Sequence, residues 1–317
     1  MMVQKNSRAA LMALTVAVIL WGGSFSAMRT VLQELDPMSV MWLRMVFASV
    51  TILPFISRLR PPEGWKKDYK ILIPMVLFQP CLYFLLESNA LRLTSSSQAG
   101  VISSFVPLFV SLGAWLFLSE KLHLKGIAGL FLSISGVVVL TLLNGDVEGG
   151  SRMMLGNTME VGAMICAAAN MLIIKKLSSR YNTWTMTMMQ CFAGVLFFLP
   201  GLFKLMEQGW VISGQTLLLL LYLGAPVSLG AFGLYNLGMS RMTASGASVF
   251  INLVPVVAVI TGWVVLHETL SVLQIFASAA VLTGVLISQD KRSSRMSERK
   301  AGSSAGSKIR PLWSSRN

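Results

Sequence analysis

The stretch from Ala99 to Leu122 reads AGVISSFVPLFVSLGAWLFLSEKL, and the stretch from Ala247 to Leu270 reads ASVFINLVPVVAVITGWVVLHETL. The two align without a gap at a constant offset of 148 residues, and the agreement continues beyond them. Leucine and valine matches arise easily between apolar segments, whereas proline, tryptophan, glutamate and glycine in register do not. These shared positions are Pro107 and Pro255, Trp115 and Trp263, Glu120 and Glu268, and Gly136 and Gly284. The chain therefore contains an internal repeat.

The composition is that of a membrane protein. Of the 317 residues, 54% are hydrophobic and only 12% are charged, with a mean hydropathy of +0.68, whereas a soluble domain carries about 25% charge. The net charge of +13 therefore indicates which loops face which side of a membrane, and we expect no nucleic-acid partner. Cys81, Cys166 and Cys191 lie in apolar runs, which predicts buried thiols and no disulfide.

Ten stretches are long and apolar enough to cross a bilayer as a helix of about 20 residues. The first is too long for the apolar part of a cleaved signal peptide, so we expect it to be retained. The remaining chain, 290–317, is rich in serine, lysine and arginine, which predicts a disordered basic tail. The predicted spans lie near 9–28, 39–57, 71–91, 95–118, 123–143, 156–176, 183–203, 215–238, 243–266 and 270–288.

The basic residues orient these spans. With the N-terminus inside, Arg29, Arg92, Arg152 and Lys204 face outside, and Arg44 lies within a span. The other 21 of the 26 Lys and Arg residues face the cytoplasm. Because cytoplasmic loops carry an excess of Lys and Arg, this distribution predicts a multi-pass protein of the cytoplasmic (inner) membrane with both termini cytoplasmic.

The orientation explains the repeat. An offset of 148 residues corresponds to five spans, and an odd number places the second copy upside down relative to the first. The predicted fold is an all-α membrane protein whose ten transmembrane helices form two inverted five-helix repeats, residues 1–148 and 149–289. Inverted repeats are a common plan of secondary transporters.

Several short motifs carry a resemblance to a known family. They are Leu20-Trp21-Gly22-Gly23-Ser24-Phe25, Leu43-Arg44, Asn89-Ala90-Leu91, Leu118-Ser119-Glu120-Lys121-Leu122 and its echo Leu266-His267-Glu268-Thr269-Leu270. In this order and spacing they resemble the EamA-type ten-helix members of the drug/metabolite transporter superfamily, over nearly the whole membrane portion.

The resemblance implies a proton-linked or facilitated carrier of small metabolites, often amino acids and often exported. It also implies a cavity lined by the first, third, fourth, sixth, eighth and ninth helices. It identifies neither the substrate nor the direction, and the sequence does not distinguish a monomer from a homodimer.

Two prolines at corresponding positions of the two repeats predict paired helix breaks. Pro107 and Pro255 lie near mid-membrane, where each frees the carbonyl four residues earlier. Ser104 and Asn252 occupy matching positions beside them. Corresponding breaks in two repeats indicate the central site of a transporter, although a locally satisfied packing kink explains them equally.

Polar residues within the spans are the other candidates for substrate contact. Gln79, Tyr83 and Glu87 form one stripe of the third span, and such a stripe must face protein or water rather than lipid. A hydrogen bond between helices explains each position as well as substrate binding does. The predicted substrate-binding set is Trp21, Gln79, Tyr83, Ser104, Asn170, Tyr235 and Asn252.

Three charged side chains, Arg44, Glu87 and Glu160, lie at similar depth in the outer third of the membrane. Equal depth predicts a structural ion pair or an outer gate between Arg44 and Glu87, with Glu160 as the competing partner. Glu120 and Glu268 directly precede spans, and we interpret them as caps of the helices that follow.

Other functional classes are disfavoured. The phosphate-binding motif GxxxxGK[ST] is absent, which argues against an ATP-driven pump. HExxH is also absent, only His123 and His267 occur, and the aspartates lie in loops. We therefore expect neither an enzyme nor a bound cofactor or metal. A small-molecule channel and a non-transporting membrane subunit stay as alternatives to a secondary transporter of amino acids or related metabolites, with efflux as the expected direction and protons as the expected coupling ion.

Overall fold

The computed structural model describes residues 2–59, 61–118, 150–241, 247–268 and 271–288, and a few positions between 119 and 149. The predicted fifth span, Glu120 and the predicted tail 290–317 lie outside the described residues. Every regular element of the described part is helical. In chain order these are α1 (Met2–Val31), α2 (Pro37–Ile52), η1 (Leu53–Arg58), η2 (Trp65–Asp68), α3 (Tyr69–Val76), η3 (Leu77–Leu82), α4 (Tyr83–Leu93), α5 (Ser96–Ser103), α6 (Val106–Leu118), α8 (Gly150–Leu177), α9 (Thr183–Phe197), α10 (Pro200–Glu207), α11 (Gly214–Tyr222), η4 (Leu223–Ala231), α12 (Phe232–Arg241), η5 (Val249–Leu253), α14 (Val254–Leu266) and α15 (Val272–Ser288).

Each predicted span within the described residues coincides with a helix or a run of helices. Six of these are long and apolar enough to cross a membrane. The predicted seventh span is a pair, α9 and α10, bent by 51° at Pro200. The predicted ninth and tenth spans contain shorter apolar helices, Phe250–Leu266 and Ile275–Gly284.

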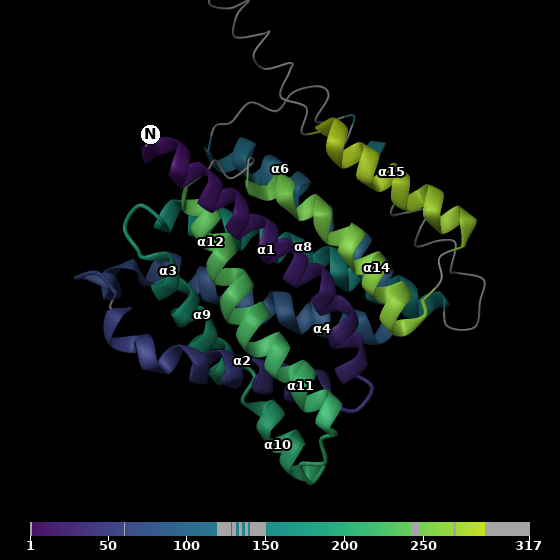
Figure 1. Ribbon diagram of the computed structural model, residues 1–317, viewed down its shortest axis with the longest axis horizontal. Helices are drawn as coiled ribbons and strands as arrows, with labels where there is room; N and C mark the ends of the chain where they lie inside the picture. Colours follow the sequence, from purple (N-terminus) through teal and green to yellow (C-terminus); the bar gives the residue numbers. More distant parts are fainter. Residues whose placement is uncertain are drawn as a thin grey trace, which may run out of the picture.

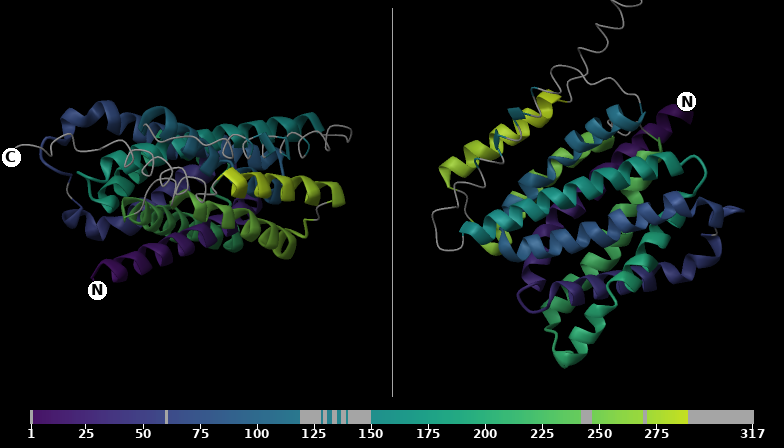
Figure 2. Two further views of the ribbon diagram at one scale, coloured as in Figure 1. Left: turned by 90° about the horizontal axis from the view of Figure 1, so that it is seen from above. Right: turned by 180° about the vertical axis from the view of Figure 1, so that it is seen from behind.

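The helices form two layers. Figure 1 shows α1 crossing the front of the molecule between α12 and α14, which both pack against it. Seen from above, α1, α12 and α14 make one layer and α4 and α8 belong to the other (Figure 2, left). In the rear layer α8 packs along α4 and α6. The buried interior lies between the two layers, and helices from both layers contribute side chains to it.

The ends of the helices carry polar caps. Asp36, Ser95, Asn182 and Ser213 stand in extended backbone just before α2, α5, α9 and α11, and each side chain accepts a backbone N–H of the first turn. Such a cap satisfies one of the donors that a helix start leaves without a partner. Pro37 follows Asp36 at the first helical position, where a missing N–H is harmless.

Charged residues assigned to one membrane side by the sequence meet in the structure. On the predicted outer side, Asp36 binds Lys204 at 3.0 Å, and Glu34 accepts the Ser213 hydroxyl at 2.8 Å. On the predicted inner side, Arg180 lies 2.8 Å from Asp68, which also accepts the Tyr181 hydroxyl. The two sets lie at opposite ends of the spans.

The predicted third and eighth spans contain π-helical turns at corresponding positions. η3 holds Pro80, and Gln79 departs from helical backbone at φ −148° and ψ 122°. η4 holds Pro226 and covers the residues that lie 148 positions after η3. Because such turns interrupt the regular hydrogen-bond ladder, backbone groups and side chains can be redirected there. The repeat thus extends to the irregular backbone beside the interior.

Two further breaks occur at the repeated prolines. α5 ends at Ser103 and α6 begins at Val106, directly before Pro107. In the second repeat the 3-10 helix η5 ends at Leu253, and Pro255 lies in the first turn of α14. Proline is tolerated in a first turn because the N–H that it lacks has no helical acceptor there. Each proline therefore starts the second half of a broken span.

Candidate functional site

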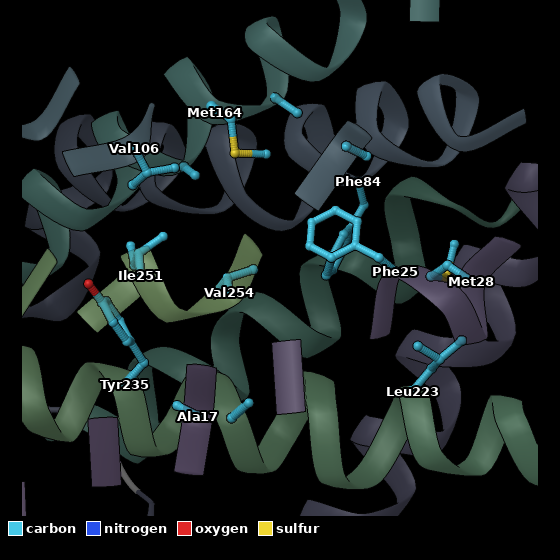
Figure 3. Close-up of a cluster of buried hydrophobic side chains, with 14 of the residues drawn as sticks. Ala17, Phe25, Met28, Phe84, Val106, Met164, Leu223, Tyr235, Ile251 and Val254 are labelled. Carbon is cyan, nitrogen blue, oxygen red and sulfur yellow. The ribbon is translucent and has the colours of Figure 1, made fainter. Parts of the chain in front are cut away.

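A small central cavity of about 40 Å³ lies between the two layers. Figure 3 shows Val106, Met164, Ile251 and Val254 around this interior. Its lining comes from the first, third, fourth, sixth, eighth and ninth predicted spans, the set that the family resemblance implies. One residue from each is Trp21, Tyr83, Val106, Met164, Phe232 and Val254.

Aromatic rings form one wall of the central cavity. The Trp21 ring lies 5.0 Å from that of Phe232 and 4.8 Å from that of Tyr235, centroid to centroid. Phe232 also meets Phe84 edge to face at 5.8 Å. The Tyr235 hydroxyl and the Trp21 indole N–H are buried and form no hydrogen bond with the described residues. The Trp21 N–H is therefore available to a polar molecule in the cavity, whereas the predicted contact residue Tyr235 packs against Trp21 and is not among the residues that line the cavity.

Two of the three residues in the polar stripe of the third span line a cavity. Gln79 and Tyr83 line the central cavity, and Gln79 also borders a neighbouring cavity of about 20 Å³. Gln79 owes this position to the π-helical turn that carries it. The third member, Glu87, lines neither cavity and instead accepts a hydrogen bond from the Tyr83 hydroxyl.

Three other predicted contact residues have different surroundings. Ser104 is buried and donates to the Val101 carbonyl at 2.7 Å, and its neighbour Ser103 lines the central cavity instead. The Asn170 amide donates to the Met75 carbonyl at 2.6 Å, which joins α8 to α3. Asn252 lies in η5 beside Ile251, whose side chain faces the cavity.

Arg44 and Glu87 lie together in the interior. Arg44 is 1% exposed and Glu87 is 4% exposed. Their closest charged atoms, Arg44 Nη1 and Glu87 Oε2, are 3.9 Å apart. Arg44 Nε donates to Ser228 Oγ at 2.6 Å, and its guanidinium carbon lies 4.2 Å from the Phe84 ring centre. The pair thus joins α2 and α4 to η4 across the two repeats.

Glu160 is fully buried on α8, and neither carboxylate oxygen has a hydrogen-bond partner among the described residues. Its electrostatic neighbours are Glu87 and Tyr83 on α4. Arg44 contacts Glu87 and forms no ion pair with Glu160. The arrangement therefore holds two carboxyl groups and one guanidinium in a small apolar volume.

Glu268 closes the predicted outer end. Its carboxylate accepts the backbone N–H groups of Ser96 and Ser97, both at 3.0 Å, and both serine hydroxyls, and it lies 3.4 Å from Arg29 Nε. Glu268 therefore caps α5 of the first repeat, which corrects the expectation that it caps the helix after it. We call Glu268, Ser96, Ser97 and Arg29 the outer latch.

The backbone at the end of α14 orients the Glu268 side chain toward α5. His267 ends α14 in left-handed conformation at φ 52°, and the Glu268 N–H donates to the Gly262 carbonyl at 3.1 Å. A Cβ on Gly262 would stand 2.6 Å from Ser97 Oγ and 2.8 Å from Glu268 Oε2. Only glycine at 262 leaves room for the outer latch.

Replacing Glu268 with glutamine is expected to open the outer end. Burial alone would raise the pKa of Glu268, but hydrogen bonds from Ser97 and Ser96 outweigh it and lower the pKa below its usual value. The carboxylate is thus charged at neutral pH, and the latch weakens only when the pH falls through that lowered pKa. Because hydrogen bonds to a charged group contribute about 1.5–3 kcal/mol, labelling of a cysteine introduced at Ser103 from outside should accelerate about tenfold or more. The control is the same cysteine combined with Glu207→Gln, an exposed carboxylate, and it should be labelled at the rate seen without either glutamine substitution. Equal labelling rates in the two variants would mean that Glu268 does not keep the outer end closed.

Several residues of the site were missed at the sequence level. Ser228, the hydrogen-bond partner of Arg44, and Gln190, which donates to the Gln79 carbonyl at 2.9 Å, were not among the predicted residues. Phe84, below the guanidinium, was not predicted either. The available signal was Pro80 and Pro226, two prolines inside corresponding spans, which mark the irregular turns around which these residues gather.

The described residues contain no group of three or more His, Cys, Asp or Glu side chains that could hold a metal ion. Cys81, Cys166 and Cys191 are free and buried. What the interior offers is apolar and aromatic surface, a few hydrogen-bond donors and one group of charged side chains. Apolar walls with a few polar groups are the composition of small-molecule binding sites.

Comparisons with known proteins agree with this architecture. Residues 8–142 and 154–288 each match the family model described as the EamA-like transporter family. The chain is 26% identical to the uncharacterized transporter YetK of Bacillus subtilis (91% of this chain and 89% of YetK). It is 24% identical to a probable amino-acid metabolite efflux pump of Escherichia coli (86% of this chain and 92% of the pump). A solved crystal structure shares the fold with a TM-score of 0.62 and 20% identity, over 89% of this chain and 96% of the other. Two matches to one family model, together spanning most of the described helices, place this multi-pass membrane protein in the EamA-like transporter family.

Proposed function

We propose that the protein is a secondary transporter that exports small metabolites, amino acids or related compounds, across the cytoplasmic membrane by alternating access. The observation that carries the proposal is a cavity to which six spans of both repeats contribute, lying beneath an outer latch that joins the repeats. A site at the interface of two inverted repeats is where secondary transporters bind their substrates. The amino-acid class rests on the name of the Escherichia coli relative.

The proposed orientation places both termini in the cytoplasm. It rests on the excess of Lys and Arg in the connections assigned to that side. A phosphatase reporter that works only in the periplasm, fused after Asp290, should be silent. Strong activity of this fusion would reverse the proposed sidedness of the outer latch.

The experiment that tests the function combines export profiling with reconstitution. Cells overproducing the protein are challenged with amino acids, dipeptides and toxic analogues, and the compounds that accumulate outside are identified. The best of them is then tested for counterflow in proteoliposomes. A carrier gives saturable counterflow, a channel gives flux without it, and a non-transporting subunit gives neither.

Residues that line the central cavity are expected to react with a small water-soluble thiol reagent when replaced singly by cysteine. The test positions are Trp21, Gln79 and Tyr83, in a background lacking the three native cysteines. The transported compound should slow labelling, because it excludes the reagent from the same space. Asn170→Cys is the comparison variant, because Asn170 lines neither cavity and donates to the Met75 carbonyl. Labelling of the comparison variant alone would place the binding site elsewhere.

A further inference from the structure

We propose that Glu160 is the proton-binding carboxyl group of the transporter, and that the proton on Glu160 is exchanged for the exported metabolite. The proposal rests on the transport function proposed above and names its coupling ion. It follows from three observations: the surroundings of Glu160, the charge of the group that contains it, and its place between the cavity and the outer end.

The surroundings of Glu160 do not support a buried negative charge. The side chain is 0% exposed, and both oxygens lack hydrogen-bond partners among the described residues. An ionised carboxylate removed from water without a partner costs several kcal/mol, whereas a protonated carboxyl group carries no net charge. By contrast, Glu87 has both the Tyr83 hydroxyl and the Arg44 guanidinium as partners.

The charge of the group requires one proton. The ionisable side chains facing Glu160 are Tyr83 and Glu87 from α4, and Arg44 from α2 faces Glu87. Tyr222 from α11 and Cys191 from α9 are the further ionisable groups near Arg44. With Tyr and Cys neutral, one guanidinium balances one carboxylate, and the second carboxyl group is neutral only when it holds a proton. Because Arg44 contacts Glu87, the proton belongs to Glu160.

Glu160 also lies between the central cavity and a buried polar cluster. One helical turn toward the inner end, Met164 lines the central cavity, and one turn toward the outer end lies Asn157. The Thr94 hydroxyl donates to Asn157 Oδ1 at 2.6 Å, and Asn157 is 3.4 Å from Gln98 Oε1, all three residues being buried. This polar cluster connects the outer end of α5 to the Glu160 face of α8. A proton can thus bind Glu160 when the outer side opens and leave toward the cytoplasm when the inner side opens.

Infrared difference spectroscopy in lipid tests the proton directly. The wild-type protein at neutral pH should show the C=O stretch of a protonated carboxyl group. The variant Glu160→Gln should lose this band. The matched variant Glu34→Gln, which changes an exposed carboxylate of the outer connection, should keep it. Absence of the band from the wild type, or its persistence in Glu160→Gln, would overturn the proposal.

Proteoliposomes separate coupling from transport. With the radiolabelled amino acid chosen by export profiling, a pH gradient should drive accumulation by the wild type. Glu160→Gln should lose this accumulation while counterflow of the same compound continues, because counterflow needs no net proton movement. Glu160→Asp should recover part of the gradient-driven accumulation. If the wild type shows counterflow that no pH gradient affects, the proton proposal is wrong and the transport function stands. If the wild type shows no counterflow, the proposed function itself fails.

Discussion

Neutralising either member of the Arg44–Glu87 pair should severely reduce folded transporter and transport rate. Removing one partner of a buried ion pair leaves the other charge uncompensated and costs about 3–5 kcal/mol. Both side chains are almost fully buried, and their charged atoms are 3.9 Å apart. Arg44→Gln and Glu87→Gln should therefore each be strongly defective. The double variant should be less impaired than the sum of the two, with a coupling energy of about 0.5–3 kcal/mol.

A second cycle, between Arg44 and Glu160, controls for the first. Arg44 forms its ion pair with Glu87 and hydrogen-bonds to Ser228. The effects of Arg44→Gln and Glu160→Gln should accordingly combine almost additively. Both cycles use transport rate and the yield of monodisperse protein as readouts. Coupling in the second cycle and additivity in the first would transfer the proposed pair from Glu87 to Glu160.

Replacing Gly100 with leucine should prevent α5 and α14 from packing. A Cβ at position 100 would stand 2.3 Å from the Ala258 Cβ, so even the first added atom overlaps the opposing helix. Overpacking of a close contact costs about 1–3 kcal/mol or more, and here it separates helices from the two repeats. The thermal unfolding temperature and the yield of monodisperse protein should both fall.

The matched control is Gly214→Leu at the start of α11. A Cβ added there has no other atom within 4 Å, so the same substitution meets open space. Its unfolding temperature should stay close to that of the wild type. A similar loss in both variants would point to an effect of leucine on expression or insertion, and not to the crossing of α5 with α14.

The helices were predictable because the membrane imposes their length. An apolar run of about 20 residues has few alternatives to a spanning helix, and the described spans follow those runs. Depth counted along the helices placed Arg44, Glu87 and Glu160 at one level and left either carboxylate as the partner of Arg44, and the structure sets Glu87 3.9 Å from it. Both predictions depend only on distance along a helix axis, which sequence position gives directly.

Rotation about the helix axis was less predictable. The sequence suggested Ser104, and the structure places its neighbour Ser103 at the cavity. The α5 helix ends at Ser103, so helical periodicity no longer determines which side chain faces the interior. The groups that donate hydrogen bonds to Glu268 lie more than 170 positions earlier, in α5. No local pattern distinguishes such a contact from a cap on the next helix. The π-helical turns that redirect Gln79 also leave no periodic signal.

The contact between Phe84 and Phe232 has a consequence for motion. The two residues are 148 positions apart and are thus equivalents in the two repeats. If alternating access exchanges the conformations of the two repeats, every distance between such equivalents is mapped onto itself. The 5.8 Å between these ring centres would then be the same in both end states, whereas the contact between Trp21 and Phe232 would be exchanged for one between Ala169 and Phe84.

The side chains around this contact differ between the two repeats. The counterparts of Tyr83 and Glu87, 148 positions later, are Ala231 and Tyr235, and the counterpart of Arg44, counted from the matching caps Asp36 and Asn182, is Gln190. If the protein works by alternating access, its two end states therefore have similar geometry but different energies, since closing one side brings charged side chains together and closing the other brings uncharged ones together. One side would then be the more stable closed state before any gradient acts, and added salt would affect the two half-cycles unequally.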